Sequence, residues 1–166
     1  MTVQDYPFTY EEMEPFFDKF EKICGASGQA GNLNGEIQSG GNPFEQPRQN
    51  PYPTKPLQRL YAGDVFAKAA EKMGYHPFPC PAANCTEAWT NPYKVQLGVC
   101  NYCGFCERFG CFNYSKGSPQ SCVIPSLKAY DNFELRTNAQ VIRVNTDNTG
   151  KQATGVTYID ASGNEV

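Results

Sequence analysis

The residues with the clearest capacity for chemistry are four cysteines that lie close together in the middle of the 166-residue chain. Cys100, Cys103, Cys106 and Cys111 follow the spacing C-x2-C-x2-C-x4-C. Thiolates this close in sequence can converge if the backbone curls around a shared metal centre, and we predict that these four hold one. Contiguous runs are typical of iron–sulfur ligation, whereas zinc ribbons split their ligands into two separated pairs. The spacing therefore favours an iron–sulfur cluster over zinc.

Three other interpretations of the cysteines stay open at this level: structural zinc, disulfides in an oxidising compartment, and free thiols packed as small apolar groups. The remaining four cysteines are less informative. Cys80 and Cys85 could be a ligand pair or a disulfide and are left unassigned, whereas Cys24 and Cys122 are predicted to be buried small hydrophobic residues. His76, the only histidine, lies in a proline-rich stretch and is expected to pack or hydrogen-bond rather than catalyse.

Two helices are predicted to flank a long loop in the first half of the chain. Thr9 and Glu12 have the form of a capping box, and a helix over 10–23 follows, with a phenylalanine-rich stripe that we expect to pack on the protein itself. A second helix is predicted over 64–73, with Asp64 as its cap and Gly74 beyond its end. The segment 25–56 is rich in Gly, Asn, Gln and Pro and indicates a long loop.

The end of the chain has the pattern of an antiparallel β-meander. Strands are predicted over 133–138, 139–146 and 154–159, with a turn at 147–151 and another reversal at 161–164. A returning strand is expected to begin at Val166, and we predict that the chain is truncated there. The fold class is α+β: two short helices and long irregular loops, followed by the meander.

Composition excludes several classes of function. With 14 basic and 17 acidic side chains, and no basic stripe, the chain is not expected to bind nucleic acid. No stretch approaches the roughly 18 consecutive apolar residues of a membrane span, and no export signal precedes residue 10.

Residues 100–141 resemble the glucose–methanol–choline flavoprotein oxidoreductases, and most of all the large subunits of gluconate 2-dehydrogenase type. The resemblance is carried by the cysteine run, by Ser115–Pro119 and Val123–Pro125, and by Phe133–Val141. The segments 6–21 and 154–163 are similar to the N-terminal helix and to a strand pair of the FAD domain of that family.

The resemblance implies an enzyme that transfers hydride from an alcohol group of a sugar or sugar acid to FAD, and electrons through an iron–sulfur cluster to an acceptor. Cys100, Cys106 and Cys111 would then hold a [3Fe-4S] cluster, although the extra Cys103 leaves [4Fe-4S] open, and Val141 would contact the FAD adenine through its backbone. The implied partners are a small subunit and a cytochrome c-type subunit. The implied location is periplasmic, with membrane association through those partners.

Two family features have no counterpart here, namely a Gly-x-Gly-x-x-Gly run that opens a βαβ unit and the catalytic His/Asn pair. We therefore predict no catalytic residues in this chain, and an internal fragment without activity of its own. Its expected regions are a helix and loop part of the substrate or cap region over 1–99, a cluster-binding loop over 100–125, and part of the FAD-binding domain over 126–166. A zinc-stabilised interaction module and a free-standing iron–sulfur electron carrier are the alternatives from other functional classes.

Overall fold

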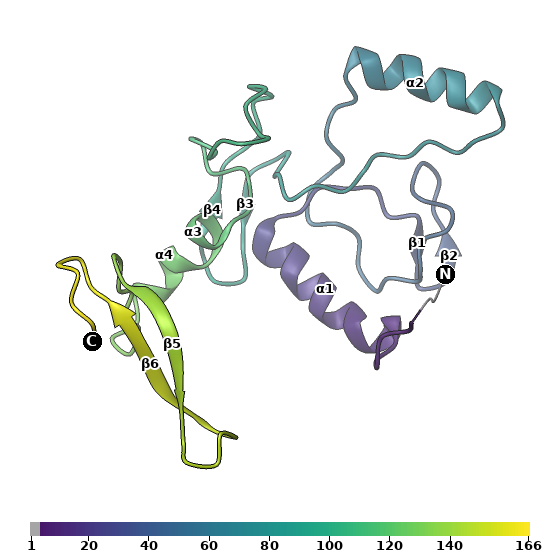
Figure 1. Ribbon diagram of the computed structural model, residues 1–166. Coiled ribbons are helices and arrows are strands. Elements are labelled where there is room, and N and C mark those ends of the chain that lie inside the picture. Colours follow the sequence, from purple (N-terminus) through teal and green to yellow (C-terminus); the bar gives the residue numbers. More distant parts are fainter. Residues whose placement is uncertain (1–3) are drawn as a thin grey trace. The chain divides into compact units, whose positions relative to one another are not determined.

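The computed structural model describes residues 4–166 and contains both helices and antiparallel strand pairs, as expected for an α+β chain (Figure 1). The chain divides into two compact units, one ending at Leu127 and the other running from Lys128 to Val166. In the described part of the chain, no helix combines the length and apolar character needed to cross a membrane.

Helix α1, Tyr10–Cys24, begins and ends where local sequence signals place it. The Thr9 hydroxyl accepts from the Glu12 backbone N–H at 3.3 Å, and the Glu12 carboxylate accepts from the Thr9 N–H at 2.7 Å, which completes the predicted capping box. Gly25 adopts the left-handed conformation at φ 62°, and its N–H closes the last turn on the Glu21 carbonyl.

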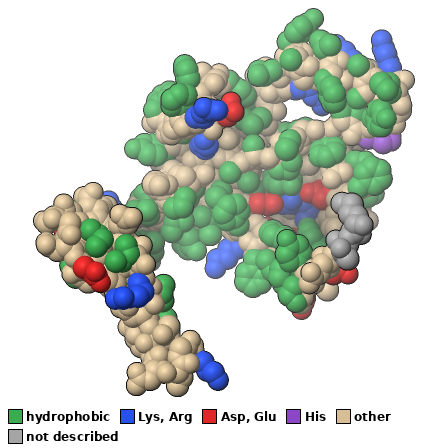
Figure 2. Space-filling view, in the orientation of Figure 1, with side chains coloured by type: hydrophobic (Ala, Val, Ile, Leu, Met, Phe, Trp, Pro, Cys, Tyr) green, Lys and Arg blue, Asp and Glu red, His purple; other side chains and the backbone are tan. Residues whose placement is uncertain are grey.

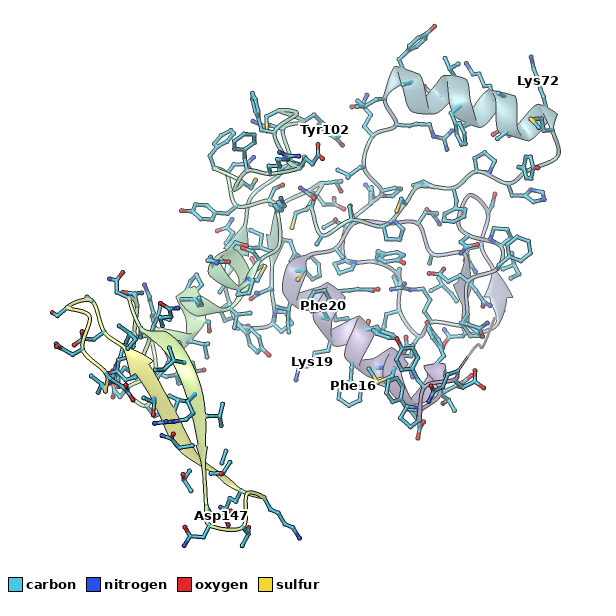
Figure 3. The ribbon with its side chains drawn as sticks, in the orientation of Figure 1. Phe16, Lys19, Phe20, Lys72, Tyr102 and Asp147 are labelled. Atoms are coloured by element: carbon cyan, nitrogen blue, oxygen red, sulfur yellow. The ribbon has the colours of Figure 1, made fainter. Side chains whose placement is uncertain are left out.

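The side of α1 that is buried differs from the one that the apolar stripe predicts. Phe16, Phe17 and Phe20 are exposed, whereas Glu14 and Cys24 are buried. Phe16, Lys19 and Phe20 point out from the same side of the helix (Figure 3), and hydrophobic side chains cover much of the visible surface (Figure 2). The prediction that this stripe packs on the protein itself is therefore wrong for the three phenylalanines within residues 4–166, because the loop beside α1 covers its more polar side. Ile23, which continues the stripe, does pack against buried residues.

Helix α2, Tyr61–Lys72, begins earlier than predicted. Its N-cap is Leu60, which offers no side-chain cap, and Asp64 lies inside the first turn. The capping role assigned to Asp64 is wrong, since a carboxylate within the first turn favours the helix through the helix dipole instead. The end of the helix matches the prediction, because Gly74 has φ 83°.

The long loop between the helices is better ordered than its composition suggests. It contains the short antiparallel pair β1 (Asn32–Leu33) and β2 (Glu36–Ile37). Ser27 forms isolated bridges to both Thr54 and Ala82, which hold three distant segments side by side. Backbone pairing of this kind requires no repeating side-chain pattern, and composition alone therefore did not reveal it.

The small apolar core lies at the C-terminal end of α1. Cys24, Cys85, Leu97 and Cys122 are its fully buried members. The antiparallel pair β3 (Trp89–Thr90) and β4 (Gln96–Leu97) and the four-residue helix α3 (Pro119–Cys122) contribute to this core, and a second four-residue helix, α4 (Ile124–Leu127), follows α3.

Asn91, in the turn between β3 and β4, ties this core together. It is 2% exposed, and its amide nitrogen donates to the carbonyls of Ile23 at 3.2 Å and Cys122 at 2.7 Å. Its amide oxygen accepts from the backbone N–H groups of Tyr93 and Val95. All the hydrogen-bonding capacity of this buried side chain is thus directed at backbone.

The second unit is a hairpin of β5 (Gln140–Thr146) and β6 (Ala153–Ile159) with two register shifts. The predicted strand over 133–138 is absent: that segment is irregular and pairs with no strand in the described chain. The chain does reverse at 161–164, and Val166 exchanges both backbone hydrogen bonds with Tyr158 at 2.8 and 2.9 Å. The expected return therefore begins, and two full strands replace the predicted three.

Candidate functional site

The cysteine run lies in an irregular loop that is anchored at both ends. The Cys100 N–H donates to the carbonyl of the buried Cys85 at 2.8 Å. The Lys116 ammonium donates to the carbonyls of Cys106 and Phe109, which fixes the far side of the loop. The hydroxyl oxygen of Tyr102, which is labelled in Figure 3, accepts a hydrogen bond from the Gln58 N–H at 2.8 Å.

The four cysteines do not converge on a common point in this geometry. Cys103 and Cys106 are exposed, and Cys100 and Cys111 are half-buried. Among residues 4–166, no three side chains of the His, Cys, Asp and Glu type are grouped so that they could hold a metal ion. The residues as arranged thus do not fit an iron–sulfur cluster or zinc, and the ligand assignment stays a prediction.

Backbone N–H groups around Cys111 favour its thiolate form. Partial burial raises the pKa of its thiol, but backbone N–H groups of Lys116, Ser115 and Asn113 outweigh this effect and lower the pKa from its ordinary value. N–H groups directed at a sulfur stabilise the thiolate, which is the form that binds metals.

Three cysteines outside the run form a buried thiol cluster: Cys24, Cys85 and Cys122. The Cys85 thiol donates to the Cys24 carbonyl at 3.6 Å. The pKa of Cys24 is raised to about 11 and that of Cys85 to about 12. Burial is the larger cause in both cases, and the neighbouring Cys122 is the next. Cys24 and Cys122 are buried small groups, as predicted, and all eight cysteines of the chain are free thiols. Cys80 is exposed while Cys85 is buried, so these two are not paired.

These environments predict a sharp difference in alkylation. At pH 8, raising a thiol pKa from 9 to about 11 lowers its thiolate fraction about 100-fold, and burial blocks access further. We expect iodoacetamide to modify Cys80 and Cys103 at least about 100-fold faster than Cys24 and Cys85 in the native chain. Peptide mass spectrometry over a time course gives the rates. A urea-unfolded sample is the control, in which all rates should converge, and equal native rates at Cys24 and Cys80 would contradict the buried cluster.

A second polar group, which sequence patterns did not reveal, lies beside α1. Arg48 is 6% exposed and forms ion pairs with Glu21 and with Glu45, the latter at 3.3 Å. Its Nε donates to the Asn50 carbonyl at 2.9 Å, and its guanidinium lies 3.7 Å from the centre of the Tyr52 ring. Burial raises the pKa of Glu21, although the hydrogen bond from Arg48 opposes that rise. Glu21 lies on α1, whereas Glu45 and Arg48 lie in the loop, and such a long-range charge group leaves no periodic signal in the sequence, which explains why it was missed.

His76 is exposed, and the packing role predicted for it is wrong. It lines a shallow hollow with Glu71 at the end of α2 and with Tyr75 and Pro77 on the chain that follows.

Val141 lies in β5 opposite Tyr158, and its backbone faces the outer edge of the hairpin. Tyr158 directs both its N–H and its carbonyl at Val166, and it therefore cannot bond to β5. The Val141–Tyr158 pair is consequently of the non-hydrogen-bonded kind, and the N–H and carbonyl of Val141 point away from β6. A donor and an acceptor thus lie side by side on this edge, which is the arrangement that an adenine edge requires.

Comparison with known proteins defines the class first: the similar proteins are named as a flavoprotein, dehydrogenases and oxidases. No protein-family model matches the chain. The "gluconate 2-dehydrogenase flavoprotein" of Pantoea cypripedii is 45% identical over the whole chain, which corresponds to 28% of that protein. The "2-methyl-1,2-propanediol dehydrogenase" of Mycolicibacterium austroafricanum is 31% identical over 94% of the chain and 25% of its own length.

The "fructose dehydrogenase large subunit" of Gluconobacter japonicus is 31% identical over 48% of the chain and 13% of its own length. The particular resemblance predicted from residues 100–141, to gluconate 2-dehydrogenase flavoproteins, is therefore confirmed along the full chain. The chain spans between about one eighth and somewhat over a quarter of the length of these relatives.

Proposed function

We propose that the chain is a segment of an FAD-dependent oxidoreductase that oxidises an alcohol group of a sugar or sugar acid. The observation that carries this proposal is the 45% identity to the Pantoea cypripedii flavoprotein over all residues of the chain. The names of the other relatives support the same reaction class, since each is a dehydrogenase or oxidase. When bound, FAD supplies the acceptor for the hydride that leaves the alcohol carbon.

In this proposal the segment contributes to holding the cofactor. The outward N–H and carbonyl of Val141 pair with the adenine edge, while the register shift after Val141 sets the direction of that edge. The side chain of Val141 is half exposed and flanks the same edge. The partners proposed for the whole enzyme are a small subunit and a cytochrome c-type subunit, in a periplasmic, membrane-associated complex.

A segment exchange tests the flavin part of the proposal. Residues 1–166 replace the corresponding segment of the Pantoea cypripedii flavoprotein, and FAD content and gluconate-dependent dye reduction are measured. We expect both to persist, and Val141→Pro, which removes the outward N–H, to lower FAD occupancy at least tenfold. Val144→Pro is the matched control. Because of the register shift, Val144 pairs with Val156, two residues from Tyr158 on β6, so its N–H also points away from β6 and no ladder bond is lost. A folded exchange protein without flavin, or equal losses in both variants, would contradict the proposal.

An iron–sulfur relay is a further part of the proposed function. The observed arrangement of the cysteines does not support it. Its basis is the spacing of the run and the thiolate-favouring surroundings of Cys111. The same exchange protein, analysed for iron and acid-labile sulfide, tests it. Cys106→Ser should abolish both if the run binds a cluster, and Cys80→Ser, another exposed cysteine, should not. Iron content that does not depend on Cys106 would remove the relay from the proposal.

A further inference from the structure

A cavity of about 370 Å³ lies between α1 and the loop that follows β2, within the first unit. Acidic and aromatic side chains make up much of its lining. They include Tyr10, Glu14, Phe17, Asp18, Phe44 and Glu45. Nothing in the oxidoreductase proposal uses this cavity.

Glu14 is the unusual residue of the cavity wall. It is 5% exposed, and its Oε1 accepts from the Gln49 backbone N–H at 2.8 Å. Its Oε2 is buried and has no hydrogen-bond partner among the described residues. A buried carboxylate oxygen without a donor is costly, and its presence in a cavity wall indicates a site that is completed by a donor from outside.

Arg48, which lines the cavity, and Lys22, which lies outside its lining, are both committed to other groups. Arg48 donates to Glu21, Glu45 and the Asn50 carbonyl. The Lys22 ammonium lies 2.6 Å from Asp18. Glu14 is therefore left with no cationic partner, and the cavity has more carboxylates than cations, which favours entry of a positive group.

The shape and chemistry of the walls limit the kind of cation. No three acidic side chains in the described chain are grouped to share a metal ion. The rings of Tyr10 and Phe17, two helical turns apart on α1, lie with centroids 6.1 Å apart, and Glu14 comes between them in the sequence. Aromatic faces attract an organic cation and pack against its apolar part.

We propose that this cavity binds a primary ammonium group on an apolar stem, with the ammonium donating to Glu14 Oε2 and the stem lying against Tyr10 and Phe17. A free organic amine and a lysine side chain of another polypeptide segment share this chemistry. Two probes distinguish them: phenethylamine for the free amine, and N-acetyl-lysine methylamide for the protein side chain.

The test is an NMR titration of the ¹⁵N-labelled 166-residue chain, followed at the Gln49 amide because that N–H bonds to Glu14. We expect a saturable shift with at least one amine, and at least tenfold weaker binding of the uncharged analogue 2-phenylethanol. Glu14→Gln, which keeps the shape and removes the charge, should weaken amine binding at least tenfold. Glu71→Gln, an exposed acid on α2, is the matched control and should leave the affinity unchanged.

Each outcome bears on the proposal. Tighter binding of phenethylamine supports a free amine as occupant, and tighter binding of the lysine derivative supports a protein side chain. Absence of a saturable shift with both amines, or equal affinity for 2-phenylethanol, overturns the proposal. If Glu14→Gln fails to fold, as judged by circular dichroism, the comparison of charged and uncharged probes on the unmodified chain still decides the question.

Discussion

Arg48→Met should lower the free energy of unfolding of the first unit by about 3–5 kcal/mol, because it leaves Glu21 and Glu45 without their buried cation. Trp89 is the only tryptophan, and its indole N–H donates to the Lys22 carbonyl at the end of α1, so its fluorescence reports on this unit during urea unfolding. The matched control is Arg59→Met. Arg59 is 41% exposed and lies 3.8 Å from Asp64, and its loss should cost less than about 1 kcal/mol.

The pH dependence of the Arg48→Met effect gives a second check. Burial already raises the pKa of Glu21, and removing the hydrogen bond from Arg48 raises it further. A carboxyl whose pKa is raised in the folded state destabilises that state when ionised, and it regains stability as falling pH protonates it. The loss caused by Arg48→Met should therefore shrink between pH 7 and pH 5. An effect that is constant over this range, or no larger than that of Arg59→Met, would contradict the buried ion-pair assignment.

Gly25→Ala should have the other large effect on stability. The left-handed φ of 62° costs about 1–2 kcal/mol for a residue with a Cβ. The added Cβ would also lie 2.4 Å from the Cys85 sulfur and 2.8 Å from the Trp89 ring, which adds about 1–3 kcal/mol of overpacking. We expect a total loss of about 2–5 kcal/mol in urea unfolding, together with a changed Trp89 emission.

Gly74→Ala separates the two contributions to that loss. Gly74 has a similar φ of 83°, but a Cβ there would meet nothing within 4 Å. This variant should lose only the backbone contribution, about 1–2 kcal/mol. Equal losses of unfolding free energy at the two glycines would show that the core does not crowd a Cβ at position 25 as described.

Sequence patterns predicted those features that depend on neighbouring residues. The capping box of Thr9 and Glu12 and the left-handed conformation of Gly25 depend only on nearby residues. These two signals located the start and the end of α1. The burial of Cys24 and Cys122 also followed from their apolar neighbours. The start of α2 was misplaced because Leu60 caps without a side chain, which leaves no signal in the sequence.

The features that escaped prediction depend on contacts between distant segments. Arg48 meets Glu21 across 27 positions, and Gln49 meets Glu14 across 35. The exposed phenylalanines of α1 were expected to be covered because an apolar stripe shows which face can pack, but not which part of the chain packs on it. The cysteine spacing likewise predicted convergence, although the loop between its anchors leaves the sulfurs apart. Its ligand role stays a prediction.

Asn91 leaves little freedom for replacement, because all four of its side-chain hydrogen bonds go to backbone groups. Asp has the same shape but no N–H to offer the Ile23 and Cys122 carbonyls, whereas Leu has neither donors nor acceptors for the four backbone groups. Gln carries the right groups on a stem one methylene too long for a side chain that is 2% exposed. The junction of α1, the β3–β4 turn and α3 therefore selects Asn over Asp, Leu and Gln at position 91, through both its hydrogen-bonding groups and its length.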